Sequence, residues 1–193
     1  RYLAAPTVAA LSVATGPVRG GTVVSVSGTN FDVSGPSGYV KCLFGTREVT
    51  ASASSNTTWI ICTSPAGSAG AVAVTLSFSN GVDYTPTSTT FTYYADQTVS
   101  SISPVNGGVG GGTNVTVTGS GFAGATQCKF GSTAVATATV VNGQTVMCLS
   151  PVGSAGSVSV EVSQNGLDYT QDGVRFEYQA TATVTAVYPV QGT

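Results

Sequence analysis

The chain of 193 residues carries 6 Lys or Arg, 8 Asp or Glu and no histidine, so its formal net charge is −2. Six scattered cations are too few for the basic stripe of a nucleic-acid-binding surface, and without histidine there is neither a Ser-His triad nor a His-ligated metal site. No apolar run approaches the ~20 residues of a membrane-spanning helix. Hydrophobic residues nevertheless make up 41% of the chain, which is enough for a folded core.

An internal repeat covers the chain, and it organises every other prediction. The repeated motifs are Gly-Gly-Thr (20–22 and 111–113), Gly-x-x-Phe (28–31 and 119–122), Cys-x-Phe-Gly (42–45 and 128–131), Cys-x-Ser-Pro (62–65 and 148–151), Gly-Ser-Ala-Gly (67–70 and 153–156), Asn-Gly-x-Asp-Tyr-Thr (80–85 and 165–170) and Phe-x-Tyr (91–93 and 176–178). The first copy contains small insertions, one of them around residues 34–38. We therefore predict two homologous domains, at residues 1–95 and 96–180.

Alternation of apolar and small polar residues predicts β-strands in both units, taken in chain order. The clearest are residues 22–27 and 71–76 in the first unit and residues 113–118 and 157–162 in the second. The Asn-Gly pairs that begin at Asn80 and Asn165 predict hairpin turns, because Asn and Gly tolerate positive φ angles. About seven short strands per unit, separated by Gly, Pro and Ser, are typical of a β-sandwich.

The joint between the units, residues 95–97, contains no flexible Gly/Ser tract, which favours a fairly stiff tandem. A third unit begins after the second, because residues 184–189 repeat residues 99–104. We expect residues 181–193 to form the first strand of a third repeat, with Val184, Val187 and Tyr188 as contact residues. This strand belongs either to a further domain of a longer tandem protein or to a joint in which it completes a neighbouring molecule.

The order of these motifs resembles the IPT/TIG domain, an immunoglobulin-like fold shared by plexins, hepatocyte-growth-factor-type receptors, many protist and microbial surface proteins and some transcription factors. The resemblance spans both units and the opening of the third. It implies an all-β fold of two tandem immunoglobulin-like (IPT/TIG) β-sandwiches plus the first strand of a third repeat. It also implies a spacer or adhesion role more than a chemical one. The DNA binding of some members disagrees with the six cations of this chain.

Each unit contains two cysteines at equivalent positions, Cys42 and Cys62 in the first and Cys128 and Cys148 in the second. Of the three possible pairings, the repeat favours one disulfide within each unit, because equivalent positions have equivalent neighbours. The spacing does not match a zinc ribbon, and no histidine can complete a zinc site. Free thiols in a cytosolic protein remain the alternative. Paired cysteines indicate an oxidising, extracellular or cell-surface location.

Two Asn-x-Ser/Thr sequons agree with that location, at Asn56 and Asn114. Asn114 has the opposite strand parity to Val115 and Val117, so we expect it on the outer face. We expect Asn56 to be exposed in the turn before Trp59. Sequons also arise by chance in a Thr-rich chain, so each site is either glycosylated or unmodified. Covalent glycans would supply the solubility that a surface poor in charge lacks.

Candidate catalytic and cofactor chemistry is nearly absent. The glycine-rich residues 107–112 lack the Lys-Ser/Thr ending of a phosphate loop. The repeated carboxylates Asp83 and Asp168 follow Asn-Gly turns, where bonding to nearby backbone is the usual role. We therefore predict no cofactor, no metal and no enzyme activity. The unrepeated aromatic residues Trp59, Tyr39, Tyr94 and Tyr188 are the best candidates for contacts outside a domain.

These observations favour a non-enzymatic extracellular structural protein, in which tandem domains form a rigid glycosylated stalk or fibril. Its partners would be neighbouring IPT/TIG-like domains of the same chain or further copies joined head-to-tail through the terminal strand. The alternative is a cell-surface receptor or adhesion ectodomain that recognises a protein or carbohydrate partner.

Overall fold

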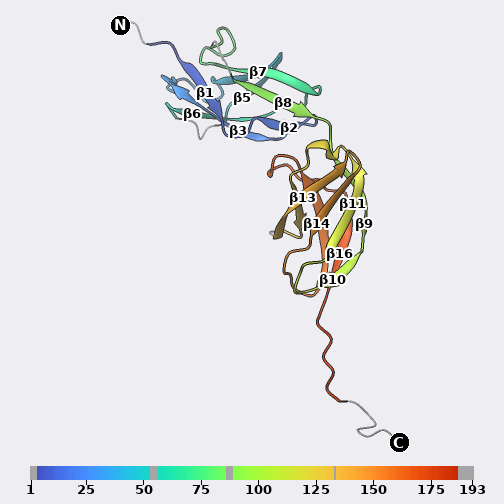
Figure 1. The fold of residues 1–193 in the computed structure, drawn as a ribbon. Coiled ribbons are helices and arrows are strands. Elements are labelled where there is room, and N and C mark those ends of the chain that lie inside the picture. The colour runs from blue at the N-terminus through green and yellow to red at the C-terminus, as the bar shows by residue number, and fades with distance from the viewer. Residues whose placement is uncertain (1–3, 53–55, 86–88, 133, 187–193) are drawn as a thin grey trace, which may run out of the picture. The chain divides into compact units, whose positions relative to one another are not determined.

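The computed structural model describes residues 4–52, 56–85, 89–132 and 134–186 (Figure 1). The chain divides into two compact units, which contain strands β1–β8 and β9–β16. Across the described residues the secondary structure is β-strand apart from one short 3₁₀ turn, η1 (Phe122–Gly124). The predicted all-β fold is therefore confirmed.

The first unit is a sandwich of two sheets. Its strands are β1 (Thr7–Leu11), β2 (Thr15–Pro17), β3 (Val23–Thr29), β4 (Lys41–Phe44), β5 (Arg47–Thr50), β6 (Trp59–Thr63), β7 (Gly70–Ser77) and β8 (Thr90–Tyr94). One sheet has the order β1-β3-β6, and the other has the order β2-β8-β7-β4-β5. Neighbouring strands are antiparallel except β2 and β8, which run parallel.

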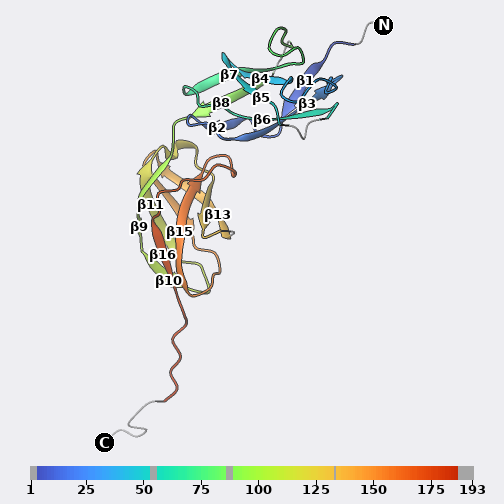
Figure 2. The same cartoon turned by 180° about the vertical axis from the view of Figure 1, so that it is seen from behind.

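The second unit repeats this arrangement, with one strand that belongs to both faces (Figure 2). Its strands are β9 (Thr98–Ser103), β10 (Asn106–Gly108), β11 (Asn114–Ser120), β12 (Gln127–Phe130), β13 (Ala134–Asn142), β14 (Thr145–Leu149), β15 (Gly156–Ser163) and β16 (Arg175–Gln179). The first half of β13 pairs with β12 and the second half pairs with β14. The strand order is therefore continuous, β10-β16-β15-β12-β13-β14-β11-β9.

The core of each unit lies between its sheets, and every second side chain of the strands points into it. In β3 the side chains of Val24 and Val26 are fully buried, as are those of Val115 and Val117 in β11. An aromatic chain continues the core in both units, because Phe44, Phe91 and Tyr93 pack edge to face, as do Phe130, Phe176 and Tyr178. Each such buried ring stabilises the fold by about 2–3 kcal/mol.

The turn at Asn80 forms as predicted, but the hairpin does not. Asn80 and Gly81 both have positive φ, at 56° and 84°. However, β7 ends at Ser77 and β8 begins at Thr90, so the turn lies inside a longer connection and does not join the strands directly. The connection is fixed by Thr85, whose Oγ1 accepts a hydrogen bond of 3.1 Å from the Leu76 N–H.

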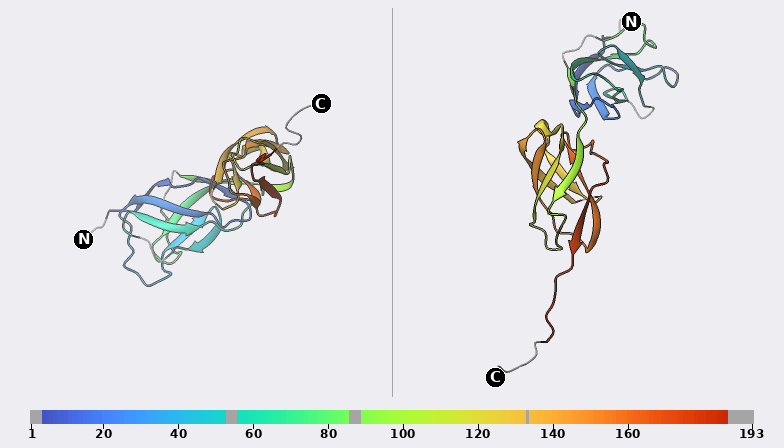
Figure 3. Two further views of the ribbon diagram at one scale, coloured as in Figure 1. Left: turned by 90° about the horizontal axis from the view of Figure 1, so that it is seen from below. Right: turned by 90° about the vertical axis from the view of Figure 1, so that its right-hand side faces the viewer.

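Beyond β16 the described residues 180–186 form no strand (Figure 3). Val184 is 82% exposed. Val187 and Tyr188 lie outside the described residues. The terminal strand therefore stays a prediction, and so do the domain boundaries at residues 95 and 180.

Candidate functional site

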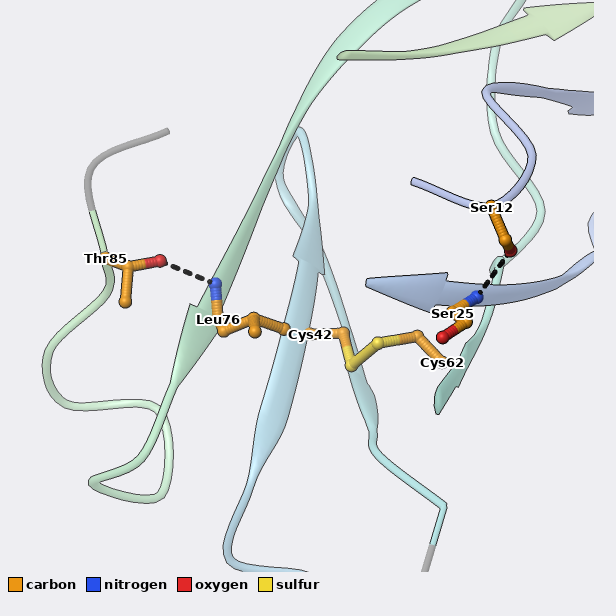
Figure 4. The surroundings of a disulfide bond; sticks show 6 residues. All are labelled: Ser12, Ser25, Cys42, Cys62, Leu76 and Thr85. Carbon is orange, nitrogen blue, oxygen red and sulfur yellow. Dashed lines mark hydrogen bonds between the residues drawn. A yellow bond between two sulfur atoms is a disulfide. The ribbon is translucent and has the colours of Figure 1, made fainter. Parts of the chain in front are cut away.

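A disulfide crosses each unit between its two faces. Cys42 on β4 and Cys62 on β6 are fully buried, and their Cα atoms are 6.3 Å apart (Figure 4). Cys128 on β12 and Cys148 on β14 form the equivalent bond, with a Cα–Cα distance of 6.4 Å. This is the pairing that the repeat favours. All four cysteines are bonded, so neither the thiol nor the zinc alternative applies.

The repeated tyrosines close a loop in each unit. The Tyr93 hydroxyl donates a hydrogen bond of 2.8 Å to the carbonyl oxygen of Pro65, and the Tyr178 hydroxyl does the same to Pro151. Burial raises the pKa of both phenols above the ordinary value. The Cys-x-Ser-Pro and Phe-x-Tyr motifs therefore meet in space, and their role is to hold the loop that follows β6 or β14.

The Gly-x-x-Phe motif also has a structural role inside each unit. A Cβ atom at Gly28 would overlap the Thr7 carbonyl oxygen and the ring of Phe31. The same holds for Gly119, whose neighbours are Thr98 and Phe122. Glycine is required here because the first strand of the unit and an aromatic ring both approach its backbone closely.

The repeated aspartates belong to turns and not to a reactive pair. The Asp83 N–H donates to the Ser79 hydroxyl at 2.8 Å. In the second unit the Asn165 side chain accepts from the Asp168 N–H at 2.9 Å and donates to the Asp168 carboxylate at 2.7 Å. Within the described part of the chain, no group of three or more Cys, Asp or Glu residues could hold a metal ion. The described residues also contain no helix long and apolar enough to cross a membrane.

One charged pair lies on the outer face of the second unit. The Lys129 ammonium is 2.7 Å from the Glu161 carboxylate and 4.2 Å from the centroid of the Tyr169 ring. The two charged side chains are only 22% and 16% exposed. Lys129 and Glu161 are directly opposed across β12 and β15. The equivalent pair in the first unit is Leu43 and Thr75, opposed across β4 and β7.

The two units also differ on the outer face of the sheet that contains β3 or β11. In the first unit this face carries Val23, which is 59% exposed, and the partly buried Trp59 and Ile61. Their equivalents in the second unit are Asn114, Thr145 and Met147. Two other aromatic residues that the repeat does not conserve between the units, Tyr39 and Tyr94, are partly buried.

The two sequons have different surroundings. Asn114 is exposed at the start of β11, on the side opposite the buried Val115, as predicted. Asn56 is partly buried and not fully exposed as expected. Its Oδ1 accepts hydrogen bonds from the Thr58 N–H (2.9 Å), the Thr58 hydroxyl (3.0 Å) and the Trp59 N–H (2.9 Å). The asparagine therefore organises the turn before β6.

Sequence reasoning did not find the hollow beside Asn114. It has a volume of about 480 Å³ and is lined by Asn114, Ala136, Thr137, Thr139, Met147 and Leu149. Strand parity places Asn114 on the outer face, but only the register of β11, β13 and β14 brings these residues together.

A family comparison identifies the repeat. The profile of the IPT/TIG domain matches residues 6–93 and again residues 98–178. The chain belongs to the IPT/TIG family. Both copies of the motif series lie inside the matched ranges, so the resemblance seen in the sequence is confirmed.

The chain spans only a small part of the length of the relatives that it matches. Fibrocystin-L of Mus musculus is 33% identical over 95 residues, which is 49% of this chain and 2% of that protein. The full extracellular region of plexin A4 has a similar fold in two structures. One has a TM-score of 0.57 at 20% identity and covers 97% of this chain and 18% of the plexin chain. The other has a TM-score of 0.52 at 21% identity and covers 91% and 18%.

Proposed function

We propose that this chain is a non-enzymatic, extracellular structural segment, whose tandem IPT/TIG domains form a rigid glycosylated stalk or fibril. One observation carries the proposal. The repeated Cys, Tyr and Gly residues of the motif series act inside each unit, as disulfide, loop anchor and close-packed backbone, and not in a shared reactive site. Because these repeated residues stabilise the domain that contains them, we infer that the domain has a structural role.

Three features support an extracellular location. Disulfides persist in oxidising compartments, and both units contain one. The plexin A4 structures are of an extracellular region. The two sequons provide attachment sites for N-linked glycans at Asn56 and Asn114.

The terminal segment provides the proposed joint. Val99 and Ile102 on β9 are 4% and 6% exposed, because they fill the core of the unit that β9 opens. Val8 has the same place in the first unit. Val184 and Val187 repeat Val99 and Ile102, so we place them in the core of a following domain, either in the same chain or in a neighbouring copy that it joins head-to-tail. Tyr188 would then contact that domain.

Electron microscopy of the natively isolated, undigested protein tests the proposal. Uniform filaments, or stalks with an axial repeat of one or two domains, are expected. Separate short particles without regular spacing would contradict it. The joint is tested with a chain that ends at Tyr178, which should no longer polymerise; polymerisation without residues 179–193 would rule out the terminal strand as the joint.

A receptor or adhesion ectodomain is the second candidate, and the outer face of the first unit favours it. This face carries Val23, Trp59 and Ile61 where the second unit has Asn114, Thr145 and Met147, so the first unit has a large aromatic ring there that the second unit lacks. Trp59→Thr installs the residue of the equivalent position in the second unit. A receptor predicts that this variant loses binding of the labelled full chain to cells in flow cytometry. Unchanged binding would remove this face as a recognition surface.

A further inference from the structure

The hollow on the second unit combines apolar and hydroxyl side chains without charge. Leu149 is 59% exposed at its wall, and Met147 is partly buried beside it. Thr137 and Thr139 line the side formed by β13. No charged residue occurs between Lys129 and Glu161 in the sequence. Its volume of about 480 Å³ falls within the range of small-ligand sites, which is roughly 300–1,000 Å³.

Asn114 forms part of the wall of this hollow. It pairs directly with Leu149 across β11 and β14, so the two Cβ atoms lie about 5 Å apart. Thr116, the third residue of the sequon, pairs with Met147, which is the next pair on the same face of the sheet. A group attached to the Asn114 amide therefore begins beside the most exposed apolar side chain of the hollow.

We propose that the hollow is the docking site of the N-glycan on Asn114. The inference rests on the glycosylation proposed above. The first N-acetylglucosamine lies over Leu149 and Met147 with its C–H face and acetyl methyl group, and the hydroxyls of Thr137 and Thr139 bond to its polar edge. A sugar is amphipathic in this way, and a charge-free wall of Leu, Met and Thr matches it. The glycan thereby acts as an intramolecular ligand that covers an apolar part of the sheet.

The first unit provides an internal comparison. Val23 is there in place of Asn114, and Trp59 and Ile61 are in place of Thr145 and Met147. Thr63 is in place of Leu149, so that face has neither the sequon nor the exposed leucine of the hollow. The glycan of the first unit would start instead from Asn56, whose amide oxygen is held by Thr58 and Trp59. Asn56→Gln removes that glycan without changing the hollow, but it also removes the hydrogen bonds of the turn before β6, so it is a control for the second unit alone.

The experiment uses the full chain secreted by a eukaryotic host and trimmed enzymatically to a single N-acetylglucosamine at each site. Mass spectrometry gives the occupancy of Asn114, and thermal unfolding and fluorescence of an apolar dye give the state of the second unit. Asn114→Gln should raise dye binding and lower the unfolding midpoint of this unit by about 4 °C. Thr116→Ala, which removes the sequon but keeps the asparagine, should do the same. Asn56→Gln should leave the unfolding midpoint of the second unit unchanged.

Leu149→Thr, which installs the residue found at position 63 of the first unit, completes the test. In this background the effect of Asn114→Gln should fall to less than half, because the sugar has lost its apolar contact. An unoccupied Asn114 would overturn both the glycosylation proposal and this inference. An occupied Asn114 with equal effects in the two backgrounds would overturn the inference alone.

Discussion

At the scale of single residues, the two units place different side chains at one equivalent pair of positions on the outer face. The second unit opposes Lys129 and Glu161 across neighbouring strands, and the first unit opposes Leu43 and Thr75. Both charges are mostly removed from water, so the attraction between them offsets a desolvation cost. Replacing one partner leaves the other charge without an ion-pair partner. Replacing both by Leu and Thr gives the pair of residues that the first unit has at these positions.

We therefore predict that Lys129→Leu alone destabilises the second unit by about 1–2 kcal/mol, because the remaining carboxylate is only 16% exposed. The double variant Lys129→Leu with Glu161→Thr should lie within about 0.5 kcal/mol of the natural chain. Urea unfolding followed by circular dichroism measures both. The single Trp of the chain, Trp59, lies in the first unit, so an unchanged tryptophan transition is the internal control. Additive losses in the double variant would show that the pair is not coupled.

At the scale of strands and disulfides, much could be predicted from the sequence. Alternation predicted β3, β7, β11 and β15, since Val24, Val26 and their counterparts face a core. The repeat predicted the cysteine pairing, because two copies of one fold give equivalent cysteines equivalent neighbours. Parity predicted the outward side of Asn114. These features depend on local pattern or on symmetry between copies.

The remaining features depend on long-range register. Nothing in the alternation of β13 shows that the pairing changes from β12 to β14 at Ala138. The hollow beside Asn114 depends on that change, so it could not be predicted either. The hairpin expected at Asn80 was wrong for a related reason: the bond from Leu76 to Thr85 joins the strand end to a residue beyond the turn. A turn motif specifies the local backbone, but not the strands that it connects.

The disulfides yield a prediction at this scale. Replacing Cys128 and Cys148 by alanine should destabilise the second unit by about 3 kcal/mol, because the bond closes a 20-residue segment in the unfolded chain. The tryptophan transition should not move. Replacing Cys42 and Cys62 instead should shift that transition by a similar free energy. A variant of either pair that affected the opposite unit would contradict the assignment of each bond to a separate core.

At the scale of the whole molecule, the second strand of each unit pairs in parallel with its last strand. In the first unit the Thr92 N–H donates to the Ala14 carbonyl oxygen at 2.8 Å, and the Val18 N–H donates to the Tyr94 carbonyl oxygen at 2.9 Å. These bonds join β2 to β8, and β10 joins β16 in the same way. After its first strand, β1 or β9, the chain therefore continues along a strand that lies beside the last strand and runs in the same direction.

This arrangement has a mechanical consequence. Tension applied through the two ends of a unit acts first on β1 or β9, which pairs with β3 or β11. Once that strand detaches, the tension pulls the parallel strands, β2 and β8 or β10 and β16, in opposite directions, so their hydrogen bonds are loaded together in shear and not opened one by one. Once they yield, the disulfide still holds back the 20-residue segment between its cysteines. Stretching the full chain by atomic force microscopy should show each unfolding event lengthened by about 60 Å after reduction of the disulfides. Equal lengths before and after reduction would contradict this. In a protein that transmits force, the disulfide of each unit would therefore limit how far that unit can extend.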